Sequence, residues 1–258
     1  MAREIPEDEM KVRVDLAACY RLVDHYGMSD LLGTHISARV PGKDDEFLLN
    51  PYGVYFEEMT ASALLRVNMD GEVLDDSNYS VNSAGFTIHS AILGGRPDIN
   101  CALHTHTVAG MAVGAMEEGL LPMTQTSMQF YKRLAYHDYE GGASREGAEA
   151  ECARLQKDLG PKDKAMVLRN HGLLTCGETV ADAFRNIKKL EHACEVQMHA
   201  CAMRGEGQTL RLIDEDVCEE MYQVQEKRGT TQGDMGWPGH LRRLVALARF
   251  REDPSFRN

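Results

Sequence analysis

The sequence predicts a layered α/β domain in which helices partly cover a central sheet. Strand-like segments joined by turns come first, over residues 34–49 and 66–74. Apolar strand segments then alternate with amphipathic helical segments through the middle of the chain. That order is typical of a layered α/β domain.

The N-terminal part is expected to form one helix followed by two strand hairpins. Apolar side chains recur at helical spacing from Met10 to Tyr26, and Gly27 is suited to end that helix. The turn sequence 41–45 separates the strands of the first hairpin, and Asp70-Gly71 those of the second. The remaining expected elements here are a helical turn over 28–32 and a capping pattern that begins at Thr60.

Helices and strands alternate through the rest of the domain. We expect helices over 83–93, 108–116, 145–159 and 180–202, and strands over 99–104, 120–123, 134–139 and 165–169. Two further helices, 209–227 and 239–251, are expected on either side of a Gly/Thr-rich stretch with Trp237-Pro238. The chain is thus divided into a tail over 1–9, a domain over 10–205 and a C-terminal helical extension over 206–258.

Composition restricts the kinds of partner. The formal net charge is −12 over 258 residues, so nucleic acid and anionic membranes are not expected to bind. No window approaches the ~20 apolar residues of a membrane span, and the acidic start is unlike a secretion signal. The seven cysteines form no CxxC pair, as expected for reduced thiols in the cytoplasm.

Three histidines predict a metal site. His104 and His106 are two residues apart at the end of an apolar segment, so both side chains point to one face of a strand. His171 follows a second apolar segment, 165–168. Three imidazoles that converge from two neighbouring strands would form an open divalent-metal site, with a coordination position left for water or substrate.

The other histidines are less informative. His25, His192, His199 and His240 have no such context and are expected to be ordinary surface or core residues. His35, His89 and His137 remain open between two interpretations, a substrate contact and a hydrogen-bonded core residue. A cysteine-ligated zinc site is not expected, because zinc-type cysteine spacing is absent.

Several motifs resemble the class II aldolase and adducin head domain family over roughly residues 10–205. The two that carry the resemblance surround the histidines, at 102–110 and 168–174. The supporting segments are 37–40, 49–53, 81–92, 96–98, 135–141 and 159–162. The segment 81–92 is most similar to the adducin branch.

The resemblance implies a three-layer α/β/α sandwich with a mostly antiparallel central sheet, often assembled as a homotetramer. It implies Zn²⁺, or another divalent metal such as Mn²⁺, Co²⁺ or Fe²⁺, on His104, His106 and His171. The family's enzymes act on small molecules, and the metal stabilises an enediolate-like intermediate when a C–C or C–H bond breaks.

Two departures from the family pattern bear on function. Gly85 stands where the aldolases carry a carboxylate, so proton transfer would fall to His137, Tyr136, Tyr139 or metal-bound water. The segments that bind phosphate in the sugar-phosphate enzymes are bulkier here. The substrate-binding residues implied at these positions and beside them are His35, Arg39, Asn50, Tyr52, Gly53 and Ser83, which favour a small acid over a phosphorylated sugar.

Three hypotheses follow from these observations. The first is a divalent-metal-dependent lyase, an aldolase or decarboxylase acting on a small carbonyl or carboxylic acid compound. The second is a non-catalytic, adducin-like module for oligomerisation or binding that keeps a metal site. The third is a purely structural zinc site, which would need a fourth side chain that the sequence does not indicate. Actin or spectrin contact is not supported by any residue of this acidic chain.

Overall fold

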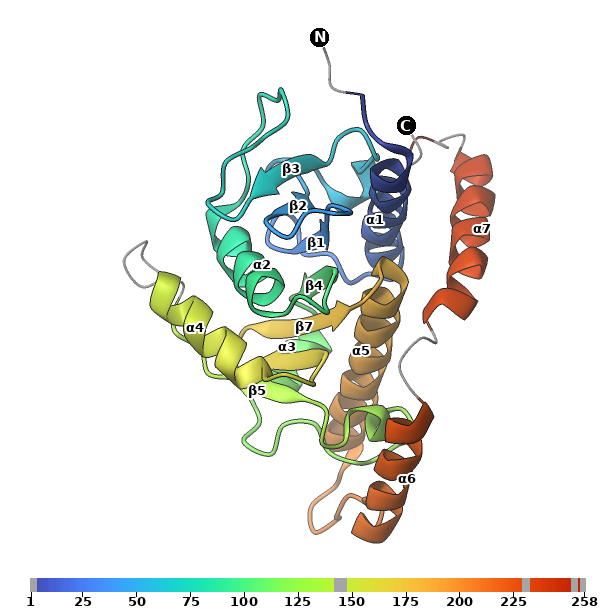
Figure 1. The fold of residues 1–258 in the computed structure, drawn as a ribbon. Helices are drawn as coiled ribbons and strands as arrows, with labels where there is room; N and C mark the ends of the chain where they lie inside the picture. The colour runs from blue at the N-terminus through green and yellow to red at the C-terminus, as the bar shows by residue number, and fades with distance from the viewer. Residues whose placement is uncertain (1–3, 142–147, 229–232, 252–254, 256–258) are drawn as a thin grey trace.

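The computed structural model describes residues 4–141, 148–228, 233–251 and 255. Its core is a seven-stranded sheet with the order β3-β2-β1-β4-β7-β6-β5 (Figure 1). Every pair of neighbouring strands is antiparallel except β5 and β6, which are parallel. The strands are β1 His35–Arg39, β2 Glu46–Leu49, β3 Leu65–Asn68, β4 Cys101–Thr105, β5 Ala135–His137, β6 Ala165–Leu168 and β7 Gly172–Gly177.

Helices cover both faces of this sheet. The helices are α1 Glu7–His25, α2 Ser83–Gly95, α3 Val108–Gly114, α4 Ala148–Leu159, α5 Val180–Met203, α6 Glu215–Arg228 and α7 Gly233–Arg251, with short 3₁₀ turns η1 Phe56–Glu58 and η2 Ser127–Phe130. In Figure 1, α2 and α4 lie to one side of the strands and α1 and α5 to the other. The predicted three-layer α/β/α sandwich with a mostly antiparallel sheet is therefore confirmed.

Side chains alternate along a strand, so successive residues of β4 point into the two hydrophobic cores on opposite faces of the sheet. Cys101 and Leu103 of β4 point into the core shared with α1, α3 and α5. Ala102, between them, points into the core under α2 and α4. His104 has the same parity as Ala102, so it emerges on the α2 and α4 face. The sheet thereby fixes the side of the molecule on which the histidines meet.

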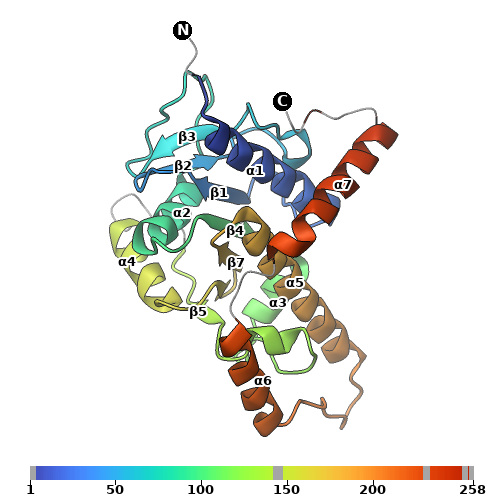
Figure 2. The same cartoon turned by 45° about the vertical axis from the view of Figure 1, so that its right-hand side comes forward.

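The C-terminal helices lie outside these layers. Figure 2 shows α7 alongside α1 and α5, and α6 apart from it near the far end of α5. Trp237 anchors α7, since its ring packs against Phe184 of α5 and its Nε1 donates a 2.8 Å hydrogen bond to Asp15 of α1. The prediction that Trp237-Pro238 precedes the helix was wrong, because Pro238 lies inside α7. Within the described residues, no helix is both long and apolar enough to cross a membrane.

Four short elements differ from the sequence-based expectation. The expected second strand of the 66–74 hairpin is reduced to an isolated bridge between Val73 and Val67. Residues 120–123 form no strand, because the backbone N–H groups of Leu120 and Leu121 are bound by the side chains of Tyr136 and Gln197. Residues 28–32 form no helical turn, since Leu31 has a φ of 46°. Thr60 caps a single turn by accepting a hydrogen bond from the Ala63 N–H, and no helix follows.

Candidate metal centre

The three predicted ligand histidines come together at one edge of the sheet. His104 lies in β4, His106 directly follows it, and His171 lies in the turn between β6 and β7. The expectation that the two strands preceding His106 and His171 are neighbours was wrong, because β7 lies between β4 and β6. Since β7 is antiparallel to both, β4 and β6 run in the same direction, and their carboxyl ends reach the same edge.

The Nε2 atoms of the three histidines converge. His106 Nε2 lies 2.8 Å from His104 Nε2 and 3.0 Å from His171 Nε2. The ring of His104 is buried, and those of His106 and His171 are partly exposed. Among the described residues, no Cys, Asp or Glu joins this group. The three nitrogens therefore form a donor set with one side left open.

Hydrogen bonds fix the tautomers of His104 and His106. His104 Nδ1 donates to the Leu173 carbonyl at 2.9 Å, and His106 Nδ1 donates to the Asp30 carboxylate at 3.0 Å. The Nδ1 atoms therefore carry the protons, and the Nε2 lone pairs face each other at 2.8 Å. A shared cation resolves that repulsion, so the residues present fit a divalent metal.

Burial keeps the imidazoles of His104 and His171 neutral, as metal ligands must be. Desolvation lowers the pKa of His104 well below its usual value, and the neighbouring histidines lower it further. Desolvation and the charge of His106 lower the pKa of His171 to about 4. Near pH 7 the Nε2 lone pairs are thus available without prior deprotonation.

A second group of polar side chains adjoins the triad. The rings of His35 and His104 lie 5.2 Å apart between centroids, since the two residues pair across β1 and β4. His35 Nδ1 is hydrogen-bonded to His89 Nε2 at 2.7 Å, and His89 Nδ1 is hydrogen-bonded to the Ser37 hydroxyl. Desolvation lowers the pKa of both His35 and His89. Both rings are therefore neutral, hydrogen-bonded groups beside the triad.

The structure explains why glycine occupies position 85, which the sequence alone did not reveal. A Cβ atom at this position would lie 2.7 Å or less from three atoms of the His35 ring. His35 is buried and held by His89, so it cannot yield without breaking that hydrogen bond. The space beside Gly85, where the aldolases carry a carboxylate, is thus filled by an imidazole.

The predicted proton-transfer residues are separated by the sheet. His137 shares the α2 and α4 face with His104, and its Nδ1 bonds to Asp158 of α4 at 2.7 Å. Its Nε2 is buried without a hydrogen-bond partner. Tyr139 is exposed, and its ring lies 6.0 Å from that of His171. Tyr136 points to the opposite face, where its hydroxyl accepts the Leu120 N–H, so the structure does not bring it to the triad.

Most of the predicted substrate-binding residues lie apart from the histidines or are already bound. Asn50 is buried and accepts a 2.9 Å hydrogen bond from Tyr20 of α1. Arg39 donates to the carbonyls of Asp44, Leu93 and Ile99. Tyr52 and Gly53 lie in an exposed loop. Ser83 begins α2, but its side chain lies outside the described part of the structure.

Two carboxylates that sequence reasoning missed support the site. Asp30 orients His106, and Asp158 orients His137. Neither belongs to a spacing motif, and each lies far along the chain from its partner. A histidine that binds a metal through Nε2 usually donates its Nδ1 proton to an acceptor. That rule predicts a partner for such a histidine, but it does not say which residue supplies it.

Replacing Asp30 by alanine is expected to weaken metal binding by about 10- to 100-fold, because His106 would lose the acceptor that fixes its tautomer. Competitive titration with a chromogenic chelator measures the affinity. Asp44→Ala removes the same charge from another exposed loop and serves as the control. Equal affinity in the two variants would contradict the orienting role of Asp30.

Fold and site together define a class II aldolase-type domain. The family model of the Class II Aldolase and Adducin N-terminal domain matches residues 14–198, and the chain belongs to this family. A Pseudomonas aeruginosa protein whose name places it in aldolase class 2 is 45% identical over 244 residues, 93% of this chain and 92% of that protein. Alpha-adducin of Rattus norvegicus is 45% identical over 208 residues, which are 80% of this chain but 28% of that protein.

Solved structures agree with this assignment. An aldolase II superfamily protein from Pseudomonas syringae matches with a TM-score of 0.85 and 40% identity, over 98% of both chains. The L-fuculose 1-phosphate aldolase from Glaciozyma antarctica matches with a TM-score of 0.80 and 28% identity, over 99% of this chain and 97% of that one. The chain is therefore similar along its length both to a named aldolase and to proteins without a named substrate.

Proposed function

We propose that the protein is a divalent-metal-dependent carbon–carbon lyase, of the aldolase or decarboxylase type, that acts on a small carbonyl or carboxylic acid compound. One observation carries the proposal, namely three Nε2 atoms that converge, with the lone pairs of His104 and His106 directed at each other and with His106 and His171 partly exposed. Zn²⁺ is the first candidate, with Mn²⁺, Co²⁺ and Fe²⁺ as alternatives. When bound, such an ion polarises a substrate oxygen as a Lewis acid and so favours an enediolate-like charge distribution.

Side chains of the protein would then carry out the proton transfer. We assign that role to His137, because Asp158 holds its Nδ1, and its buried Nε2 lies 3.8 Å from the Glu140 carboxylate and forms no hydrogen bond. A neutral Nε2 accepts a proton, and Asp158 stabilises the imidazolium that results. Tyr139, at the exposed edge beside His171, is the second candidate.

The substrate class follows from what surrounds the triad. His35 and His89 place neutral hydrogen-bonding groups beside His104. Such groups suit a carbonyl or a carboxylate better than a phosphoryl group, which requires several positive or N–H donors. This supports a small acid, whereas the similarity to L-fuculose 1-phosphate aldolase keeps a sugar phosphate among the substrates to be tested.

We also propose a cytoplasmic homo-oligomer, a tetramer as in the family's enzymes. The described structure contains exposed apolar side chains next to the centre, with Leu31 73% and Val108 71% exposed. They flank Asp30 and His106, so a neighbouring subunit that covered them would also border the site. The seven cysteines are free thiols, consistent with a reducing compartment.

A second function is favoured by one specific observation. The absence of a carboxylate at Gly85, together with the identity to alpha-adducin, supports a non-catalytic module for oligomerisation or binding that retains the metal site. In that case the triad would bind metal and no substrate would turn over.

The deciding experiment is a substrate screen of the metal-loaded protein with 2-oxo acids, aromatic carboxylic acids and sugar phosphates. We expect turnover in the first or second class, and His137→Phe is expected to reduce it by about 10²- to 10⁴-fold with unchanged metal content. His192→Phe, on the exposed side of α5, is the matched control. If the protein is fully loaded with metal and turns over no substrate of any class, the lyase proposal is wrong and the non-catalytic binding module is favoured.

A further inference from the structure

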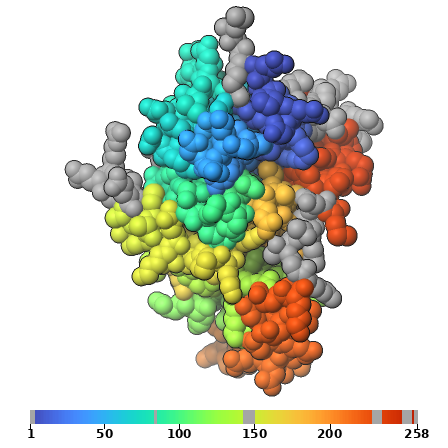
Figure 3. Space-filling model, in the orientation of Figure 1, coloured from blue at the N-terminus to red at the C-terminus, as the bar shows by residue number. Residues whose placement is uncertain are grey.

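A cavity outside the metal centre is lined by none of the three histidines. It has a volume of about 770 Å³ and is bordered by η2, the segment before β5, the loop between α4 and β6, α5 and α6. That volume is in the range of small-molecule binding sites. In the space-filling view, α6 (orange) stands beside the body at the lower right and forms one wall of this region (Figure 3).

The cavity is positively charged in an acidic protein. Its lining contains seven basic and four acidic residues, a net charge of +3, whereas the whole chain carries −12. Glu178 and Glu219 lie outside the lining but pair with Lys164 and Lys132, which lowers the excess to +1. The basic residues come from four segments that are far apart in sequence. On α5 the lining positions 182, 185, 186 and 189 share one helical face. The charge is therefore gathered here by the fold rather than by one basic stretch of sequence.

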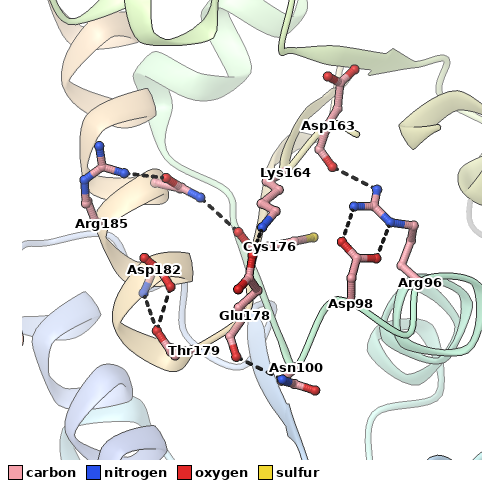
Figure 4. A network of polar contacts seen from close by, with 11 residues as sticks. Arg96, Asp98, Asn100, Asp163, Lys164, Cys176, Glu178, Thr179, Asp182 and Arg185 are labelled. Atoms are coloured by element: carbon pink, nitrogen blue, oxygen red, sulfur yellow. Dashed lines mark hydrogen bonds and ion pairs between the residues drawn. The ribbon is translucent and has the colours of Figure 1, made fainter. Parts of the chain in front are cut away.

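Part of this charge is neutralised within the wall. Figure 4 shows Arg96 paired through two hydrogen bonds with Asp98, and Lys164 joined to Glu178. Arg96 also donates to the carbonyls of Gly160 and Asp163, at 2.7 and 3.0 Å. Lys132 pairs with Glu219 and Arg133 with Glu226. These contacts fix the wall and leave Lys162 and Lys189 as lining cations that form no ion pair with a described residue.

Three donors remain for a ligand. Arg133 lines the cavity with a side chain that is 23% exposed, and its Nη2 is held by Glu226. Lys162 and Lys189 are exposed and line the same cavity from two elements, the α4–β6 loop and α5. Gln125 and Gln129 add side-chain amides to the same lining. A guanidinium held in place by a carboxylate, together with two ammonium groups, is a donor set suited to oxyanions.

We propose that this cavity binds a small molecule with two or more negatively charged oxyanion groups, either phosphates or carboxylates. Arg133 would supply the fixed donor, and Lys162 and Lys189 would contact the charged groups. Since the lining includes none of the three triad histidines, such a ligand would bind without occupying the metal centre.

Isothermal titration calorimetry with pyrophosphate and, separately, with citrate tests the proposal at constant ionic strength. Preferential binding of pyrophosphate would identify a phosphate ligand, and preferential binding of citrate a polycarboxylate. The double variant Lys162→Gln/Lys189→Gln is expected to bind the preferred anion at least ~10-fold more weakly, as for loss of hydrogen bonds to charged groups. The matched control Lys43→Gln/Lys157→Gln removes two exposed charges that do not line the cavity and is expected to bind like the wild type.

Three results would overturn this assignment. The first is no measurable binding of either anion by the wild-type protein. The second is equal weakening in the two double variants, which would indicate a general charge effect. The third is loss of binding in His106→Ala, which would place the anion at the metal centre instead.

Discussion

His104→Ala is expected to abolish both metal retention and lyase turnover while the protein stays folded. The substitution removes one of three Nε2 donors, so the affinity should fall by more than the ~10- to 100-fold typical of losing a residue that merely orients a ligand. Metal content after dialysis, measured by mass spectrometry of the elements, and turnover of the best substrate are the two readings.

The matched control is His199→Ala, which removes an imidazole from the exposed side of α5. It should retain both metal and activity. Turnover that survives in a His104→Ala protein that has lost its metal would refute the metal-dependent mechanism, and full metal retention would refute the role of His104 as a ligand.

Gly85→Ala is expected to destabilise the protein, although alanine is the better helix former. Overpacking against the buried His35 ring costs about 1–3 kcal/mol, which exceeds the ~1 kcal/mol that alanine contributes over glycine within a helix. Urea unfolding measures the change in the free energy of unfolding.

A double-mutant cycle identifies the cause. In a His35→Ala background the ring is absent, so Gly85→Ala should become neutral or stabilising. Gly94→Ala lies in the same helix, where a Cβ meets only the Met69 sulfur at 4.0 Å, and should stabilise in both backgrounds. If Gly85→Ala is equally destabilising with and without His35, the two residues are not coupled.

The sequence was sufficient for the layers and for the meeting of the histidines, because both depend on local periodicity. Alternation along β4 places His104 on one face, and the apolar segment before His171 marks a strand that ends at the same edge. It was insufficient for β7, a six-residue strand from Gly172 to Gly177, a segment for which no element was predicted. The convergence of the three histidines was therefore predicted from an incomplete sheet.

Contacts between distant segments could not be predicted. Asp30 approaches His106 from a loop 76 positions away, and His35 meets Gly85 only because α2 packs on β1. The sequence indicated the loss of a carboxylate at position 85 but not what fills that space. Such pairings depend on tertiary packing, for which no local pattern exists.

The separation of His106 and His171 along the chain has a mechanical consequence. His106 and His171 are separated by 65 positions, and between them lie α3, β5, α4 and β6. An ion held by both would link the two ends of this long segment in the folded protein and so oppose its local opening. Metal removal should therefore quicken amide hydrogen exchange throughout β5 and β6, far beyond the residues that touch the ion.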